Sequence, residues 1–182
     1  IDKTFKRQSS FFEGTAAVHC EMAQPVCQKL REVLAKTAKN IDVKTHPEGT
    51  YVCMEGPQFS TRAESLLHRA WGGDLIGMTG MPEAKLAREA QMCYAMVALV
   101  SDYDCWKLHE YGQDRKTLLK EIIGNLVAAT NNCLKLLEAL LSSPDPLVCE
   151  ECSCRHSLDL AVWTDNKYID QTKMEQFQVL FE

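Results

Sequence analysis

The sequence lacks any apolar stretch long enough to cross a bilayer, which excludes a membrane-spanning helix. Its longest apolar run, residues 93–100, has the length of a buried strand. Clusters of lysine and arginine are also missing, because the 20 basic and 25 acidic residues are interleaved and leave a formal net charge of −5. We therefore expect neither a membrane nor a nucleic acid as a partner.

Glycine-rich nucleotide-binding loops are absent from the sequence too, as are internal repeats. We accordingly expect no dinucleotide or other cofactor. The nine cysteines are scattered and lie mostly within apolar patterns, which favours reduced thiols inside the cell over a secreted disulfide framework. The sequence begins at Ile1 rather than Met, which allows for a leader or a further stretch of protein before it.

The apolar patterns alternate between strand and helix periods. Strands are expected over residues 50–54, 74–78 and 93–100, and helices over 25–39, from 61 onward, over 82–92 and over 116–141. Thr61-x-x-Glu64 has the spacing of a capping box at the start of the second helix. The run 93–100 is apolar on both faces, as in a strand covered by helices on both sides, and the last helix is expected to pack across the sheet. This order predicts an α/β fold with α/β/α layers and a mainly parallel, partly mixed sheet.

Composition changes at residues 142–146, Ser-Ser-Pro-Asp-Pro, which is typical of a helix stop and a linker. We therefore predict a main domain over residues 1–143 and a C-terminal extension over 144–182.

Three segments with unusual polar residues follow predicted strands. In open α/β sheets, ligands bind beyond the carboxyl ends of the strands, so these segments define a candidate site. They are Glu55–Ser60, Met78–Gly80 and Ser101–Asp104.

The acidic pair Asp102 and Asp104 follows the fully apolar run directly. Burial and the charge of its neighbour would raise the pKa of one carboxyl, leaving one donor and one acceptor. Adenine offers the matching acceptor at N7 and donor at its 6-amino group. The alternative is a helix cap or an ordinary surface turn.

Thr79, Phe59 and Ser60 lie at the same predicted edge. Thr79 precedes a predicted helix start, where free backbone N–H groups favour an anion such as phosphate, although it could equally be a simple N-cap. Phe59 could stack on a purine and Ser60 could bond its rim, while the alternative for Phe59 is a place in the core.

Two other features favour structural interpretations. His19 has no partner at a recognisable spacing, which is typical of a surface histidine. The tail motif Cys149-x-x-Cys152-x-Cys154-x-His156 has ligand types suited to a metal, but its residues alternate too closely for a common zinc spacing. We therefore predict no metal site, with metal binding by this motif as the alternative.

Several long motifs, in the same order, resemble the 5′-methylthioadenosine phosphorylase family. The similarity runs from about Ile1 to the predicted helix ending near Leu141. The matching motifs are Tyr51–Ser65, Met78-Thr79 with Pro82-Glu83, Leu86–Ala90, and Ser101–Trp106.

The resemblance implies a homotrimer of the purine nucleoside phosphorylase fold, in the cytoplasm or the nucleus. It implies that phosphate, as co-substrate, attacks C1′ of methylthioadenosine and releases adenine and 5-methylthioribose 1-phosphate. By the resemblance, Asp102 and Asp104 bind adenine, and Asp102 assists its protonation. The base pocket is lined by Tyr103, Phe59 and Ser60. Met78 packs beneath the ribose, Thr79 contacts phosphate, and His19 reaches the methylthio end of a neighbouring subunit's substrate.

The sequence departs from the family at two places. Most of the family's phosphate site belongs to a region that would precede Ile1, and the segment around Gln113, a candidate specificity residue with Ser60, is shorter and more polar than expected. Two alternatives follow. One is a catalytically inactive or partner-dependent purine-binding fragment, and the other is a phosphorylase with broader purine nucleoside specificity.

Overall fold

The computed structural model describes residues 1–107, 114–144, 147 and 151–180, which form two compact units. The first unit comprises Ile1–Lys3, Val33–Met78 and Val97–Asp145. The second comprises Thr4–Glu32, Thr79–Met96 and Pro146–Glu182. Each unit is therefore built from three separate stretches of chain, and the predicted extension 144–182 contributes to the second.

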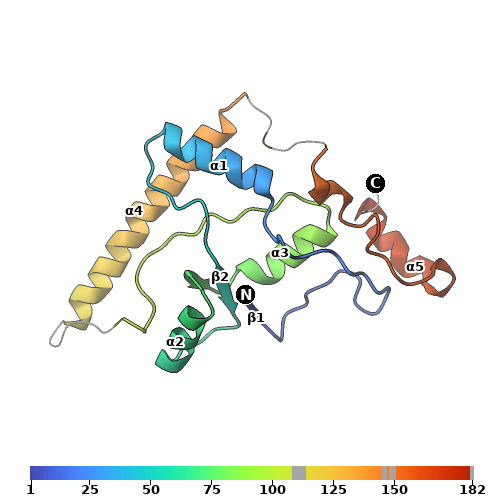
Figure 1. Ribbon diagram of the computed structural model, residues 1–182, viewed down its shortest axis with the longest axis horizontal. Helices are drawn as coiled ribbons and strands as arrows, with labels where there is room; N and C mark the ends of the chain where they lie inside the picture. The colour runs from blue at the N-terminus through green and yellow to red at the C-terminus, as the bar shows by residue number, and fades with distance from the viewer. Residues whose placement is uncertain (108–113, 145–146, 148–150, 181–182) are drawn as a thin grey trace. The chain divides into compact units, whose positions relative to one another are not determined.

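A three-stranded parallel sheet forms the centre of the first unit (Figure 1). Its order is β1 (Asp2–Lys3), β2 (Tyr51–Met54) and β3 (Leu75–Gly77), with Asp2 opposite Cys53 and Val52 opposite Ile76. Two of these strands were predicted from their β-branched and apolar residues. Val52 and Cys53 on the middle strand are almost completely buried, which identifies β2 as the centre of this core.

The four predicted helices are present, with ends that differ from the predicted ones by a few residues. They are α1 (Gln28–Asn40), α2 (Arg62–Ala70), α3 (Gly80–Glu89) and α4 (Arg115–Leu141). The tail adds α5 (Gln171–Met174) and the 3₁₀ turns η1 (Ser153–His156), η2 (Asn166–Tyr168) and η3 (Glu175–Leu180). None of the helices within the described ranges combines the length and hydropathy needed to cross a membrane.

The predicted strand over residues 93–100 is wrong. These residues are described but form neither strand nor helix, and Val97, Leu99 and Val100 are exposed. A strand needs a neighbour that pairs with its backbone N–H and C=O groups, and the described sheet provides only β1 to β3. Apolar side chains favour burial of this segment, but they do not provide a strand to pair with it.

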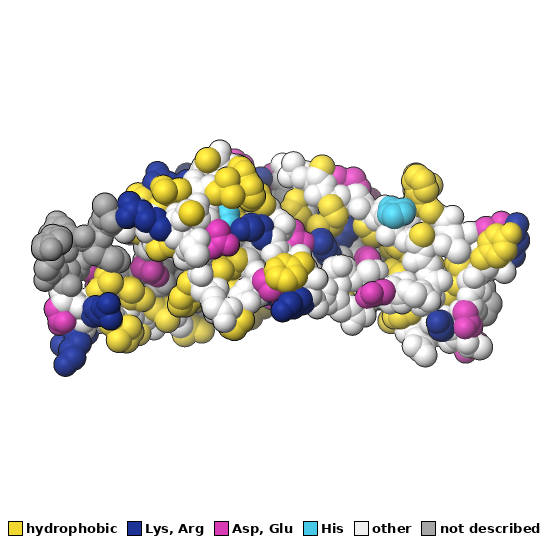
Figure 2. Space-filling model, turned by 90° about the horizontal axis from the view of Figure 1, so that it is seen from below, with side chains coloured by type: hydrophobic (Ala, Val, Ile, Leu, Met, Phe, Trp, Pro, Cys, Tyr) yellow, Lys and Arg dark blue, Asp and Glu magenta, His cyan; other side chains and the backbone are white. Residues whose placement is uncertain are grey.

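Helix α4 confirms the predicted 116–141 helix but not the predicted burial of its apolar stripe. Leu136 and Leu140 are buried, whereas the stripe used for the prediction is largely exposed, at Leu119, Ile123, Leu126, Leu134, Leu137 and Leu141. Apolar side chains are visible across the face drawn in Figure 2. The stripe therefore remains uncovered by the described part of this chain.

Two apolar clusters lie in the second unit. Phe12 packs with Leu158 and Ala161, and its ring centroid lies 5.4 Å from that of Phe177 in η3. Cys27 belongs to the other cluster, which is made mainly of cysteine side chains. Residues of the tail thus complete both clusters.

Candidate functional site

The loop after β2 turns sharply at Gly56 and meets the residue that follows β3. Gly56 has a φ of +72°, a conformation that glycine adopts without steric cost. A Cβ atom at this position would lie 2.7 Å from Sδ of Met78, so the absence of a side chain lets the two segments approach. The carboxyl ends of β2 and β3 thereby place Met78 beside the Glu55–Ser60 loop.

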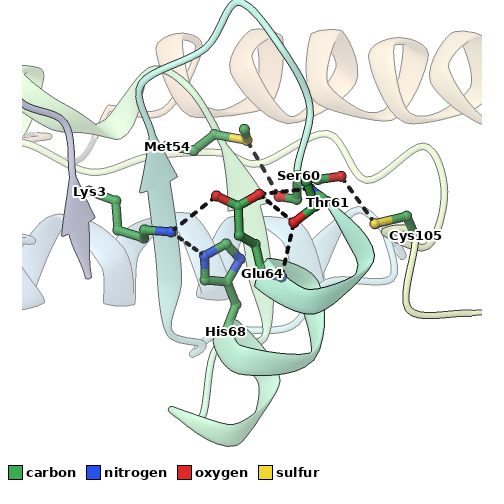
Figure 3. A network of polar contacts seen from close by, with 7 residues as sticks. All are labelled: Lys3, Met54, Ser60, Thr61, Glu64, His68 and Cys105. Atoms are coloured by element: carbon green, nitrogen blue, oxygen red, sulfur yellow. Dashed lines mark hydrogen bonds and ion pairs between the residues drawn. The ribbon is translucent and has the colours of Figure 1, made fainter.

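The capping box of helix α2 fixes the far end of this loop (Figure 3). The Thr61 hydroxyl accepts a 3.3 Å hydrogen bond from the Glu64 backbone N–H, and the Glu64 carboxylate accepts a 2.8 Å bond from the Thr61 backbone N–H. This is the arrangement predicted from the Thr-x-x-Glu spacing. The Thr61 hydroxyl also donates a 2.7 Å hydrogen bond to the Glu64 carboxylate. The bond from the Thr61 backbone N–H, and after it this bond from the hydroxyl, hold the pKa of Glu64 below its ordinary value.

Ser60 joins this loop to the segment that contains the acidic pair. Its hydroxyl lies 3.7 Å from Sδ of Met54, and its backbone carbonyl accepts a 3.2 Å hydrogen bond from the Cys105 thiol (Figure 3). The contact joins residues 45 positions apart. It brings the base-binding segments predicted after two different strands to one place.

Local hydrogen bonds set the backbone around the two aspartates. The Ser101 hydroxyl donates to Oδ1 of Asp102 at 2.5 Å, and Oδ1 of Asp104 accepts from the Cys105 backbone N–H at 2.8 Å. Asn125 of helix α4 donates from Nδ2 to the Ser101 carbonyl at 2.9 Å. Helix α4 therefore anchors the start of this segment.

The premise that the aspartates are buried is wrong for Asp102, which is exposed, while Asp104 is half-buried. The pair was expected to be buried because a buried strand was predicted before it. Residues 97–100, which lead into the pair, are instead exposed and do not pair with the described sheet. Both carboxylates are accordingly open to a ligand from solvent.

Exposed aromatic side chains belong to the same two segments as Ser60 and the acidic pair. Phe59 is 86% exposed, so the alternative of a core position for it is wrong. Tyr103 and Trp106 meet edge to face with centroids 5.7 Å apart, and the Arg69 guanidinium lies 3.7 Å from the Trp106 ring centroid. Exposed aromatic faces beside carboxylates offer both stacking and hydrogen bonding to a planar base.

A charged network missed by the sequence interpretation lies behind this loop. Lys3 Nζ is 2.9 Å from Nε2 of His68 and 3.9 Å from Oε1 of Glu64 (Figure 3). Because an ammonium group only donates, Nε2 of His68 accepts and the proton of the neutral ring resides on Nδ1. Nδ1 is buried and makes no hydrogen bond within the described residues.

Burial is the main cause that lowers the pKa of His68, and the nearby Lys3 charge lowers it further. Asp104 and Glu64 act in the opposite direction. The charge of Asp104 therefore acts on His68. Only the i, i+4 spacing of Glu64 and His68 on α2 could have linked these two residues in the sequence.

Thr79 and His19, two other predicted site residues, belong to the second unit. Thr79 is exposed and occupies the N-cap position of α3. Its side chain makes no capping hydrogen bond, so the alternative that Thr79 serves only to cap this helix is not supported. His19 is exposed, contacts Trp163 edge to face at 5.5 Å, and lines a pocket of about 340 Å³ together with Arg7. Gln113 lies outside the described residues.

Four thiols lie close together in the second unit, although the sequence predicted no metal site. Cys152 and Cys154 of the tail motif lie with Cys27 and Cys93, whereas His156 is exposed and 3.4 Å from Asp159. Cys149 lies outside the described residues.

Residues 1–142 match the family model described as the phosphorylase superfamily. The chain belongs to this superfamily. The match spans every segment of the site just described, together with Thr79 and His19. It confirms the predicted fold class, an incomplete α/β fold of the purine nucleoside phosphorylase type.

Curated relatives of this superfamily member are named S-methyl-5′-thioadenosine phosphorylase. The relative from Cereibacter sphaeroides is 45% identical over 162 residues, covering 89% of this chain and 53% of the relative. The one from Koribacter versatilis is 39% identical over 179 residues, covering 98% and 59%. The chain thus spans a little over half the length of these relatives, and the similarity extends into residues 144–182.

Solved structures agree with these relatives. A methylthioadenosine phosphorylase sourced from an antarctic soil metagenomic library is 37% identical with a TM-score of 0.80, covering 99% of this chain and 62% of that one. The adenosine/methylthioadenosine phosphorylase of Schistosoma mansoni, as a variant in complex with methylthioadenosine, is 32% identical with a TM-score of 0.65, covering 80% and 56%.

Proposed function

We propose that the protein to which this chain belongs cleaves 5′-methylthioadenosine with inorganic phosphate, giving adenine and 5-methylthioribose 1-phosphate. The observation that supports this most directly is the hydrogen bond from the Cys105 thiol to the Ser60 carbonyl. This bond joins the segment that carries the acidic pair to the loop that carries Phe59 and Ser60, which supports a shared pocket for a purine. The names and bound ligands of the relatives support the same substrate.

In this proposal Asp102 and Asp104 bind the base at N7 and the 6-amino group, and the exposed rings of Phe59 and Tyr103 contact its face. Adenine leaves poorly as an anion, so Asp102 delivers a proton to N7 as the bond from C1′ to N9 breaks. Met78 packs beneath the ribose. The phosphate anion stabilises the positive charge that develops at C1′ and then bonds to that carbon.

Phosphate is the co-substrate and no other cofactor takes part. Thr79 contacts it, and its exposed position at the start of α3 supports this role because helix N-termini favour anions. The remaining phosphate ligands belong to the part of the relatives that this chain does not span. The active protein is a homotrimer of the cytoplasm or nucleus, in which His19 reaches the methylthio group of a neighbouring subunit's substrate.

A second candidate is a phosphorylase whose main substrate is adenosine. The Schistosoma mansoni relative favours it, since its name includes both adenosine and methylthioadenosine. Comparison of kcat/KM for the two nucleosides separates the candidates: a higher value for methylthioadenosine supports our proposal, and a higher value for adenosine supports the alternative.

The central test follows adenine release from methylthioadenosine, with and without phosphate, and adenine binding by calorimetry. Phosphate-dependent release by the 182-residue chain supports the proposal and rejects an inactive fragment. Adenine binding without release supports the partner-dependent fragment instead. A chain that neither binds nor releases adenine contradicts both, because the base-binding segments described above would then have no ligand.

A further inference from the structure

Four cysteine thiols converge in the second unit, outside the site proposed above. They belong to Cys27, Cys93, Cys152 and Cys154, and their Sγ atoms all lie within 4.8 Å of one another. Three of the side chains are buried and Cys93 is half-buried, and all four thiols are free. They come from three stretches of the chain, and Cys27 and Cys152 lie 125 positions apart.

Their spacing fits a shared metal ion better than disulfide bonds. Sγ of Cys27 lies 3.7 Å from Sγ of Cys152. A disulfide requires about 2.05 Å between sulfurs. Four thiolates placed tetrahedrally about zinc at about 2.3 Å are separated by about 3.8 Å.

Main-chain hydrogen bonds fix the backbone around the thiols. Cys27 directly precedes α1, and its N–H donates a 2.8 Å hydrogen bond to the carbonyl of Tyr94, the residue after Cys93. Cys152 caps the turn η1, where its carbonyl accepts a 2.8 Å bond from the Arg155 N–H. Main-chain hydrogen bonds therefore join the Cys27 and Cys93 segments and shape the turn that carries Cys152 and Cys154.

Donors around the thiols suit negatively charged sulfur. The Cys154 backbone N–H donates to the Cys152 thiol, and Nη1 of Arg88 lies 3.7 Å from Sγ of Cys154. Arg88 is buried, and its other terminal nitrogen donates to the Gln24 carbonyl. Zinc bound by four thiolates has a net charge of about −2, which a buried guanidinium and N–H donors offset.

We propose that Cys27, Cys93, Cys152 and Cys154 bind one zinc ion in a tetrahedral, structural site. All four positions are protein ligands, so the ion has no open position for substrate or water and does not take part in phosphorolysis. Its role is to join three distant stretches of the second unit, where the surrounding apolar cluster is small. Because the unfolded chain does not present the four thiols as one site, the free energy of zinc binding adds to the stability of this unit.

The test uses the full chain, expressed with zinc and freed of loosely bound metal, with zinc measured by plasma mass spectrometry. We expect about one zinc per chain, falling at least tenfold in Cys27→Ser and Cys154→Ser. Cys20→Ser and His156→Ala, from the same unit, and Cys133→Ser, from the other, should keep the full amount. Replacement by Co²⁺ should give thiolate-to-cobalt charge-transfer bands and the d–d bands typical of tetrahedral cobalt.

Zinc below a tenth of an equivalent, with the four thiols free, overturns the proposal. So does the finding by mass spectrometry of a disulfide among these four cysteines in protein purified without oxidant. If the serine variants precipitate, the cobalt spectrum of the unmodified chain decides, because octahedral or absent bands also contradict a site with four thiolates.

Discussion

At the scale of single residues, His68 makes the stability of the first unit depend on pH. Its side chain is only 5% exposed, and burial lowers its pKa in the folded state. The unfolded chain therefore binds a proton at a higher pH than the folded chain does. Stability from this group is complete above the ordinary histidine pKa of about 6.5 and is lost as the pH falls below it.

We expect the free energy of unfolding to fall between pH 7.5 and pH 5 by at most about 1.4 kcal/mol per pH unit from His68. Urea titrations at a series of pH values measure this. His68→Gln should flatten the dependence, while His46→Gln, at an exposed position, should leave it unchanged. Equal slopes in all three proteins would show that His68 does not titrate differently on folding.

Asp102 acts at the same scale. Asp102→Asn should reduce adenine release by on the order of 10²- to 10⁴-fold, because an amide cannot deliver a proton to N7. The melting temperature should stay unchanged, since the carboxylate is exposed. Asp42→Asn is the same change at another exposed position and should keep full activity. An unaffected rate in Asp102→Asn rejects the proposed role.

At the scale of elements, the capping box is the feature that the sequence predicted best. Removal of the Thr61 hydroxyl in Thr61→Ala should destabilise the first unit by about 1 kcal/mol. Thr61→Ser retains the oxygen and should lose little. Chemical denaturation compares the three proteins. A loss as large in the serine variant would assign the effect to the threonine methyl group rather than to the cap.

The close approach of two loops at Gly56 gives another element-scale prediction. Gly56→Ala introduces both a strained φ and a contact with Met78, and we expect it to weaken adenine binding at least tenfold. Gly72→Ala is a matched control, with a φ of +80° and no atom within 4 Å of the added Cβ. It should share the backbone strain and keep the adenine affinity measured by calorimetry. Similar losses in both variants would show that strain alone matters.

Local patterns could be predicted at this scale because they depend on neighbouring residues. The periods that predict α1 to α4, β2 and β3 lie within each segment, and so does the Thr61–Glu64 cap. Pairing cannot be predicted in this way. The two-residue strand β1 has no pattern of its own, and residues 93–100 have the pattern of a strand without a described partner.

In the candidate site, too, local motifs could be predicted and contacts between distant segments could not. Motifs after the strands identified Ser60, Met78 and the acidic pair, but not the Cys105–Ser60 hydrogen bond that joins their segments. The cluster of four cysteines was also missed, because it depends on contacts between distant segments. Its members come from three stretches, and only Cys152 and Cys154 are close enough in sequence to suggest each other.

At the scale of the whole molecule, the exposed stripe on α4 is the dominant apolar surface of the first unit's longest helix. Uncovered apolar area of this kind promotes association. We expect Leu126→Glu with Leu134→Glu to lower binding of a hydrophobic dye and to shift sedimentation toward smaller species. Lys135→Glu, an exposed neighbour, should change neither. If the double variant binds as much dye as the original chain, the stripe is covered in solution.

The three-segment construction of the second unit also affects the order in which the protein can fold as it is made. The ribosome releases Cys27 and Cys93 long before the third stretch, which begins at Pro146. Until then, Phe12 has neither Leu158 nor Ala161 to pack against, so this unit can close only after its third stretch has left the ribosome. A chain cut after Asp145 would keep the three stretches of the first unit and lack the third stretch of the second.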